Sequence, residues 1–169
     1  TMILYNNSDG IVSTSTTTRI IIDQCNIHDN GGMGLNIGGS VVSISSCIVT
    51  ENLGGGIATG SGALITGNSI TDNGMFGVDI SGATKNITLT GNTISDNDGS
   101  GVVISGAASE NSITANSIFG NTGYGVSLPL GGGGGNTIGS NCIDANNSGG
   151  IFVSTKENLI CGNRIACAI

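Results

Sequence analysis

Acidic residues occupy the same place in four successive repeats of this sequence, each directly before an Asn; they are Asp29, Glu51, Asp72 and Asp96. If the repeats stack in register, the carboxylates form a row with one side chain about every 5 Å. Such a row offers the oxygen ligands that calcium prefers, or a carboxylate pair at the separation of about 5–9 Å used in glycoside hydrolysis. It equally suits a solvated turn, because like charges at this spacing repel by only about 1 kcal/mol in water. The sequence leaves these interpretations open.

A histidine and two cysteines are the other candidates for chemistry in this part of the chain. His28 precedes Asp29, and an imidazole beside a carboxylate can serve as a general base. No nucleophile is implied beside it, so we interpret His28 as a surface residue. Cys25 and Cys47 share one repeat position, where stacked coils would hold their Cα atoms about 4.8 Å apart, a separation that a disulfide accepts. Free thiols packed as small apolar side chains are the alternative.

These side chains must be positioned by a repeat with a period of 21 to 25 residues. A repeat of about this length indicates a solenoid, in which each unit buries its apolar face against its neighbours. One Asn of each repeat, followed four residues later by Gly, is predicted to point inward and to form a ladder of amides bonded from coil to coil. The ladder comprises Asn6, Asn30, Asn52, Asn73, Asn97, Asn121 and Asn146. A second column, five residues earlier, holds Thr1, Cys25, Cys47, Asn68, Asn92, Asn116 and Asn141.

Apolar residues alternate with polar ones along short segments of each repeat, as Val78 and Ile80 do on either side of Asp79. This period of two indicates strands with one buried face. Length varies only after the third such segment, for example at residues 81–84 and 130–135, which is typical of one loop of a solenoid. We therefore predict an all-β, single-stranded parallel β-helix of about seven coils with three short strands per coil, forming a single domain over residues 1–169.

Composition and charge narrow the classes of function. The chain has a net charge of −7 and only four Lys and Arg residues, whereas nucleic-acid binding requires a basic surface. Nucleic acid is therefore an unsuitable partner, as are anionic membrane surfaces. No apolar run reaches the roughly 18 residues expected of a membrane span. Abundant Gly, Ser, Thr and Asn with little Lys favour a secreted protein at an extracellular or cell-surface location.

With these repeats the chain resembles the right-handed parallel β-helix superfamily, which has the pectin-lyase-like fold, and within it the generic short-repeat type. The resemblance covers all 169 residues and implies the right-handed coil. The superfamily includes polysaccharide lyases, glycoside hydrolases, mannuronan epimerases, phage tailspikes and non-catalytic surface proteins, so the fold does not select a function. The Gly-His-Gly and Arg-Ile-Lys phrases of polygalacturonase-like enzymes are absent. An Arg base of the pectate-lyase kind is missing beside the acidic row, because Arg19 and Arg164 stand near opposite ends of the sequence.

We therefore expect a non-catalytic extracellular β-solenoid with a structural or adhesive role in a surface protein or fibre. The alternative is a polysaccharide lyase, epimerase or hydrolase, or a carbohydrate-binding domain, with the row from Asp29 to Asp96 as its site. No cofactor is predicted apart from calcium at that row. The expected partners are the remainder of a longer parent protein or further copies of the chain, both contacting the open solenoid ends, and polysaccharide.

Overall fold

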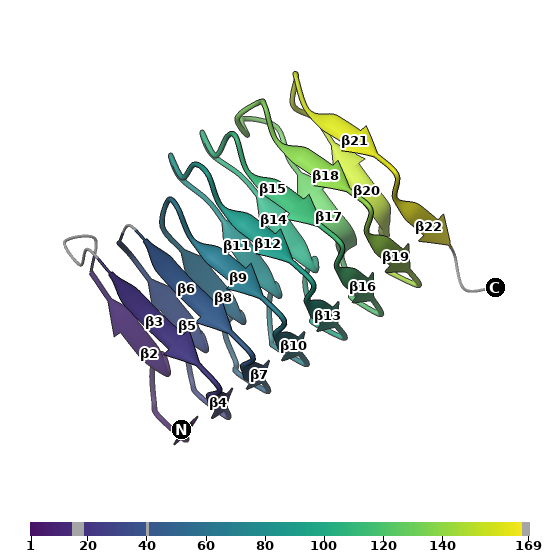
Figure 1. The fold of residues 1–169 in the computed structure, drawn as a ribbon. Coiled ribbons are helices and arrows are strands. Elements are labelled where there is room, and N and C mark those ends of the chain that lie inside the picture. The colour runs from purple at the N-terminus through teal and green to yellow at the C-terminus, as the bar shows by residue number, and fades with distance from the viewer. Residues whose placement is uncertain (15–18, 40, 167–169) are drawn as a thin grey trace.

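The structure is a computed structural model that describes residues 1–14, 19–39 and 41–166. Within these residues the regular secondary structure consists of β-strands of three to five residues. The strands wind into a solenoid with three faces (Figure 1). The predicted all-β fold, with three parallel strands in each of about seven coils, is confirmed.

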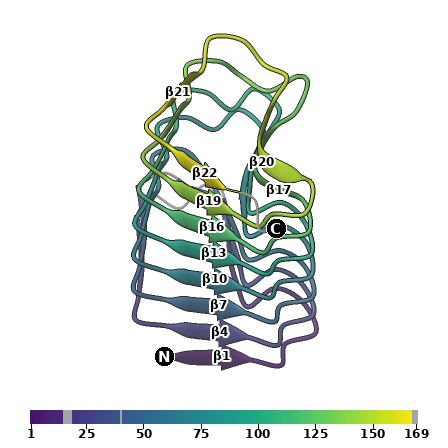
Figure 2. The same cartoon turned by 90° about the vertical axis from the view of Figure 1, so that its right-hand side faces the viewer.

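Each face of the solenoid is one parallel sheet whose strands stack in chain order. Sheet A, whose strands follow one another upward from β1 at the bottom of Figure 2, contains β1 (Met2–Leu4), β4 (Asn26–His28), β7 (Ile48–Thr50), β10 (Ser69–Thr71), β13 (Thr93–Ser95), β16 (Ser117–Phe119), β19 (Cys142–Asp144) and β22 (Arg164–Ala166). Sheet B contains β2 (Ile11–Ser13), β5 (Leu35–Ile37), β8 (Ile57–Thr59), β11 (Val78–Ile80), β14 (Val102–Ile104), β17 (Tyr124–Leu128) and β20 (Gly149–Val153). Sheet C contains β3 (Ile20–Asp23), β6 (Val42–Ser45), β9 (Leu64–Thr66), β12 (Thr88–Thr90), β15 (Ser112–Thr114), β18 (Thr137–Gly139) and β21 (Leu159–Cys161).

The interior is a thin column of aliphatic side chains. In sheet A the middle residue of each strand points inward, so that Ile70 stacks on Ile94, and both are fully buried. Leu89 holds the matching position in sheet C. Each such burial contributes about 1.5–3 kcal/mol. The period-two pattern therefore produces the core directly, because the alternate residues face solvent.

The corner between sheets A and B carries the predicted Asn ladder. Asn97 Oδ1 accepts hydrogen bonds from the backbone N–H and the side-chain amide of Asn73, at 3.1 and 2.9 Å, and Asn97 Nδ2 donates to Asn121 Oδ1 at 2.9 Å. The same Nδ2 also donates to the Ile70 carbonyl in the preceding strand of sheet A, at 3.3 Å. Continuous bonds of this kind run from Asn6 to Asn146, so the ladder is confirmed.

Two more ladders lie at the other corners. The second column forms one between sheets C and A, whose amides are bonded from Asn68 through Asn92, Asn116 and Asn141 to Asn163. A third, between sheets B and C, was not predicted and runs through Asn111, Asn136 and Asn158. In earlier coils its place is taken by Ala63 and Ile87, which are buried and apolar. The sequence signal for it was therefore confined to the last coils.

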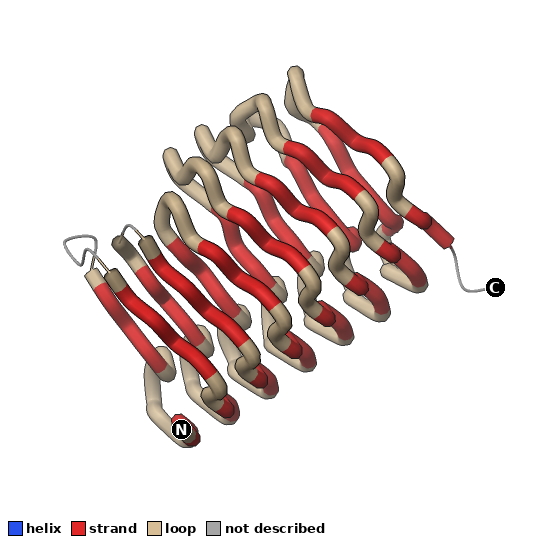
Figure 3. The backbone as a smooth tube through the Cα atoms, in the orientation of Figure 1, coloured by secondary structure: helices blue, strands red, loops and turns tan. Residues whose placement is uncertain are grey.

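The three corners differ in how much chain they contain. Figure 3 shows the loops and turns as tan segments between the strands of successive coils. The turn from sheet C to sheet A is two residues long, as at Gly67 and Asn68, whereas the connection from sheet B to sheet C runs over residues 60–63 in one coil and 129–136 in another. The expected variable loop is this last connection.

Candidate functional site

The four acidic residues of the predicted row occupy left-handed backbone positions at the corner between sheets A and B. Their φ values are 57° at Asp29, 54° at Glu51, 54° at Asp72 and 57° at Asp96. Asp tolerates this conformation better than most residues, because its short polar side chain bonds locally. The same corner position is held by Tyr5 and Ala145 at φ 56° and 49°. The column is therefore defined by backbone conformation and not by charge.

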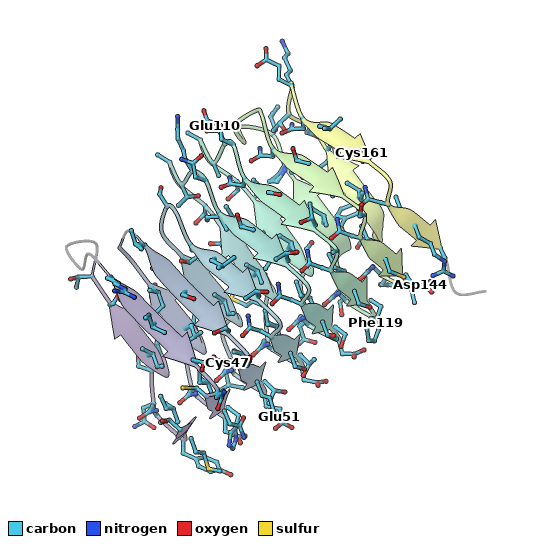
Figure 4. The ribbon with its side chains drawn as sticks, in the orientation of Figure 1. Cys47, Glu51, Glu110, Phe119, Asp144 and Cys161 are labelled. Carbon is cyan, nitrogen blue, oxygen red and sulfur yellow. The ribbon has the colours of Figure 1, made fainter. Side chains whose placement is uncertain are left out.

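The carboxylates of the row do not converge. Glu51, Asp72 and Asp96 are exposed, and only Asp29 is half-buried. Over the described ranges of the chain, no three His, Cys, Asp or Glu side chains come together as ligands for a metal ion. Figure 4 shows Glu51 at this corner and Glu110 at the far corner between sheets B and C. Calcium binding at the row stays a prediction that no cluster of ligands supports.

The one close pairing of ionisable groups in the row is that of His28 with Asp29. His28 Nδ1 lies 2.6 Å from Asp29 Oδ2, and the ring of Tyr5 contacts the imidazole edge-on with centroids 6.4 Å apart. Thr50 is the strand partner of His28, but its hydroxyl bonds to that of Thr71 at 3.1 Å. The pair thus has an orienting carboxylate, while the Thr50 hydroxyl is bonded to Thr71, and the interpretation of His28 as a surface residue stays a prediction.

A shallow hollow adjoins this pair. Its volume is about 500 Å³, and Tyr5, Asn7, Asp29 and Leu53 are among its lining residues. Asp29 is the only carboxylate in its wall. The hollow could receive a sugar ring against Tyr5, but acid–base catalysis requires a second group within hydrogen-bond reach of the reacting atoms.

Cys25 and Cys47 lie at equivalent corners of adjacent coils as free thiols, so the predicted disulfide is not formed in this structure. Cys47 is fully buried, and its Sγ lies 3.2 Å from the Ser45 carbonyl oxygen. Cys25 is half-buried, with Sγ 3.4 Å from the Asp23 carbonyl oxygen. Burial raises the pKa of the Cys47 thiol, which favours its protonated form.

Asp79 was missed by the sequence reasoning. It points outward from the middle of β11, where its strand partners are Ala58 and Val103. The carboxylate is half-buried and accepts a hydrogen bond from the Ser81 hydroxyl at 2.8 Å. Desolvation by these apolar neighbours raises the pKa of Asp79. The alternation of Val78, Asp79 and Ile80 was the available signal, because it places an acid on an otherwise weakly polar face.

The few basic residues are scattered. Lys85 Nζ lies 3.7 Å from Glu110 Oε1, and both side chains are exposed, so this ion pair contributes little. Arg164 Nη1 donates to Cys142 Sγ at 3.2 Å near the other end of the solenoid. Arg19 is exposed at the first coil. No Lys or Arg side chain is therefore recorded against the carboxylates of the acidic row in the part of the chain that the structure describes.

Comparison with known families decides the classification of this architecture. The family model described as a right handed beta helix region matches residues 2–131, which is more than half of the chain. The chain belongs to this family. The right-handed sense expected from the resemblance is thereby shown. A search of the curated proteins finds no match.

Solved structures similar to this β-helix include alginate epimerases. A double mutant of the periplasmic alginate epimerase AlgG superposes with a TM-score of 0.86 at 16% identity, covering 98% of this chain and 44% of that one. The mannuronan C-5 epimerase AlgE4 A-module of Azotobacter vinelandii gives 0.77 at 20% identity, covering 99% of this chain and 60% of that one. At these identities the likeness shows the fold. This β-helix spans about half the length of the structures it matches.

No helix in the described residues has the length and hydropathy of a membrane span. This finding accords with a fold made of short strands.

Proposed function

We propose that this β-helix is a non-catalytic, extracellular rod with a structural or adhesive role in a surface protein or fibre. The observation that carries the proposal is the dispersion of its ionisable side chains: over the described residues no three His, Cys, Asp or Glu side chains converge, and the two recorded ion pairs are far apart in the sequence. The hydrogen-bonding capacity of the corners is used instead to join the coils, as in the continuous ladder from Asn6 to Asn146. Ladders of this kind favour a stiff, regular stack.

Charge supports the same proposal against a uronate substrate. The chain carries a net charge of −7, and a uronate polymer is itself a polyanion. Binding and proton abstraction beside a uronate carboxylate require cations at the site, whether side chains or metal ions. Lys85, the basic residue in the middle of the stack, is at the corner between sheets B and C and is paired with Glu110. This arrangement is poorly suited to holding a polyanion.

The second candidate is a polysaccharide-binding or polysaccharide-active domain. Its support is the likeness to AlgG and to the AlgE4 A-module, whose names describe alginate and mannuronan epimerases. Within this β-helix the best location is the hollow of about 500 Å³ beside Tyr5 and the His28–Asp29 pair. A neutral sugar suits this hollow better than a uronate, because the carboxylate of Asp29 in the wall of the hollow would repel the carboxylate of a uronate.

An activity and binding assay separates the two candidates. The purified chain is incubated with mannuronan, polygalacturonate and a neutral glucan, each with and without calcium, with the AlgE4 A-module as positive control. Proton NMR detects inversion at C5, ultraviolet absorbance detects unsaturated products, and reducing-end analysis detects hydrolysis. We expect no reaction. Turnover that disappears in His28→Ala or Asp29→Asn would overturn the non-catalytic proposal and place the site at this hollow.

The same preparation tests calcium at the acidic row. Because the row lacks a convergent set of ligands, we expect the melting temperature to be the same with calcium as with magnesium. A calcium-specific rise that is lost in the Asp72→Asn, Asp96→Asn double variant would instead establish a metal site. Asp98→Asn, an exposed carboxylate outside the row, is the matched control.

A further inference from the structure

The corner between sheets C and A changes its chemistry at one end of the molecule. In the later coils its inward position is held by Asn side chains, of which Asn68 donates both to Asn92 Oδ1 at 2.9 Å and to the Ile44 carbonyl at 3.0 Å. In two earlier coils the same position is held by Cys25 and Cys47. The ladder of amides ends at Asn68, because the next position holds a thiol. The Oδ1 atom of Asn68 accepts a hydrogen bond from the backbone N–H of Cys47, at 2.9 Å.

The Cys47 thiol nevertheless takes the orientation of a ladder side chain. Its Sγ lies 3.7 Å from the Ile22 carbonyl oxygen, and Ile22 is the strand partner of Ile44, whose carbonyl accepts from Asn68. Asn26 and Ile48 are paired residues of β4 and β7, and the N–H of Ile48 donates to the carbonyl of Cys25 at 2.9 Å. The residues before this pair, Cys25 and Cys47, are therefore one strand spacing apart, about 4.8 Å between Cα atoms. A disulfide accepts Cα separations of about 4.4–6.8 Å.

The two thiols differ in access. Cys25 is half-buried and lines an open hollow of about 400 Å³ together with Gln24 and Ser46. Cys47 is 1% exposed and is absent from the wall of that hollow. A reagent in solution therefore reaches Cys25 first, and Cys47 is protected until Cys25 has reacted. The raised pKa of Cys47, caused mainly by burial, accords with this order.

We propose that Cys25 and Cys47 are a thiol pair that closes by exchange with a small-molecule disulfide into a covalent link between two adjacent coils. With oxidised glutathione, the Cys25 thiolate attacks one glutathione sulfur, forms a mixed disulfide and releases one glutathione thiolate. The Cys47 thiolate then attacks Cys25 Sγ, forms the Cys25–Cys47 bond and releases the second glutathione. Two electrons pass from the protein thiols to oxidised glutathione, and the two thiol protons pass to the released glutathione thiolates through solvent.

The link takes the place of the amide bond that this corner lacks. From Asn68 onward each coil is joined to the next by a hydrogen bond between two side-chain amides, whereas the coils of Cys25 and Cys47 carry thiols at this position and no amide. A disulfide restricts the unfolded chain and stabilises the folded one. Oxidation would therefore lock the first coils of the solenoid. This inference is independent of the proposed structural role, since it concerns only the two thiols.

Peptide mapping tests the pairing directly. The full chain, reduced and then exposed to oxidised glutathione at about pH 8, near the ordinary thiol pKa, is quenched with acid. It is then digested without reduction by a protease that cleaves before Asp. Cleavage separates Cys25, in residues 23–28, from Cys47, in residues 29–71, while the other cysteines lie in residues 98–143 and 144–169. We expect residues 23–28 to be joined to residues 29–71.

Two variants test the order of reaction. In Cys47→Ala we expect glutathione to remain on residues 23–28, and in Cys25→Ala we expect Cys47 to stay unmodified. The native chain carrying glutathione on Cys25 without the link, or Cys25 joined to a peptide containing another cysteine, would overturn the proposal. Oxidation should also raise the melting temperature by about 5 °C, and this rise should be absent from both variants.

Discussion

At the corner between sheets A and B, coil after coil repeats one design: a left-handed residue, a ladder Asn and, four residues later, a Gly without room for a Cβ. The connection from sheet B to sheet C changes length from coil to coil, and its inward position is Ala63 in one coil, Ile87 in the next and Asn111 in the one after. Both connections turn the chain from one sheet to the next around the same aliphatic core. They differ in what their inward side chains must bond.

The difference follows from hydrogen bonding at the two corners. At the A–B corner the Asn amide satisfies the preceding coil, the following coil and a carbonyl of sheet A, so an inserted residue would break several buried bonds at once. At the B–C corner Ile87 bonds through its backbone N–H alone to Asn111 Oδ1, at 3.0 Å. At the B–C corner the inward position therefore also accepts apolar side chains such as Ala63 and Ile87.

Removing one ladder side chain from each corner should separate the two designs most clearly. Asn97 and Asn111 are equally buried, but Asn97 makes four side-chain hydrogen bonds and Asn111 makes two. Because each buried group left unpaired costs about 1–3 kcal/mol, we expect Asn97→Ala to lower the free energy of unfolding by about 4 kcal/mol and Asn111→Ala by about 2 kcal/mol. Urea denaturation measures both. Equal losses would show that burial, and not the number of bonds, sets the cost.

Adding one methyl group to each connection should give a smaller contrast. A Cβ at Gly77 would lie 2.5 Å from Ile94 Cγ2 and 2.7 Å from the Gly101 carbonyl oxygen, whereas a Cβ at Gly82 meets nothing within 4 Å. We expect Gly77→Ala to cost about 3 kcal/mol through overpacking. Gly82→Ala should cost about 1 kcal/mol, because φ there is +74° and only the left-handed strain applies. Thermal unfolding of the two variants checks the ratio, and a Gly82 variant as unstable as the Gly77 variant would contradict it.

The same contrast explains how much the sequence could predict. The A–B corner repeats in residue type, so the ladder from Asn6 to Asn146 and the inward aliphatic residues were readable from spacing alone. The third ladder was not, because Asn111 follows Ala63 and Ile87 at its position. The acidic row was recognised from the sequence, but the reason for it was not. The corner position has a left-handed backbone conformation, which Asp tolerates, and the sequence does not reveal φ. Tyr5 and Ala145 in that column were the overlooked signal.

Asp79 provides the smallest test, on the outer face of sheet B between the two connections. Its pKa is raised above the ordinary value of 3.8 by desolvation, so the folded protein binds a proton more tightly than the unfolded chain. The contribution of Asp79 to stability is therefore full below pH 3.8 and is lost as the pH rises from there through the raised pKa.

Asp79→Asn removes this titration and keeps an acceptor for the Ser81 hydroxyl, which lies 2.8 Å from Asp79 Oδ2 in the native chain. At neutral pH we expect the variant to melt about 1–2 °C above the native chain, a small shift because the carboxylate is partly solvated. The difference should shrink to zero as the pH falls below 3.8. Asp98→Asn, at an exposed carboxylate, should show no such dependence. If both variants follow the same pH profile, net charge and not the desolvation of Asp79 governs the effect.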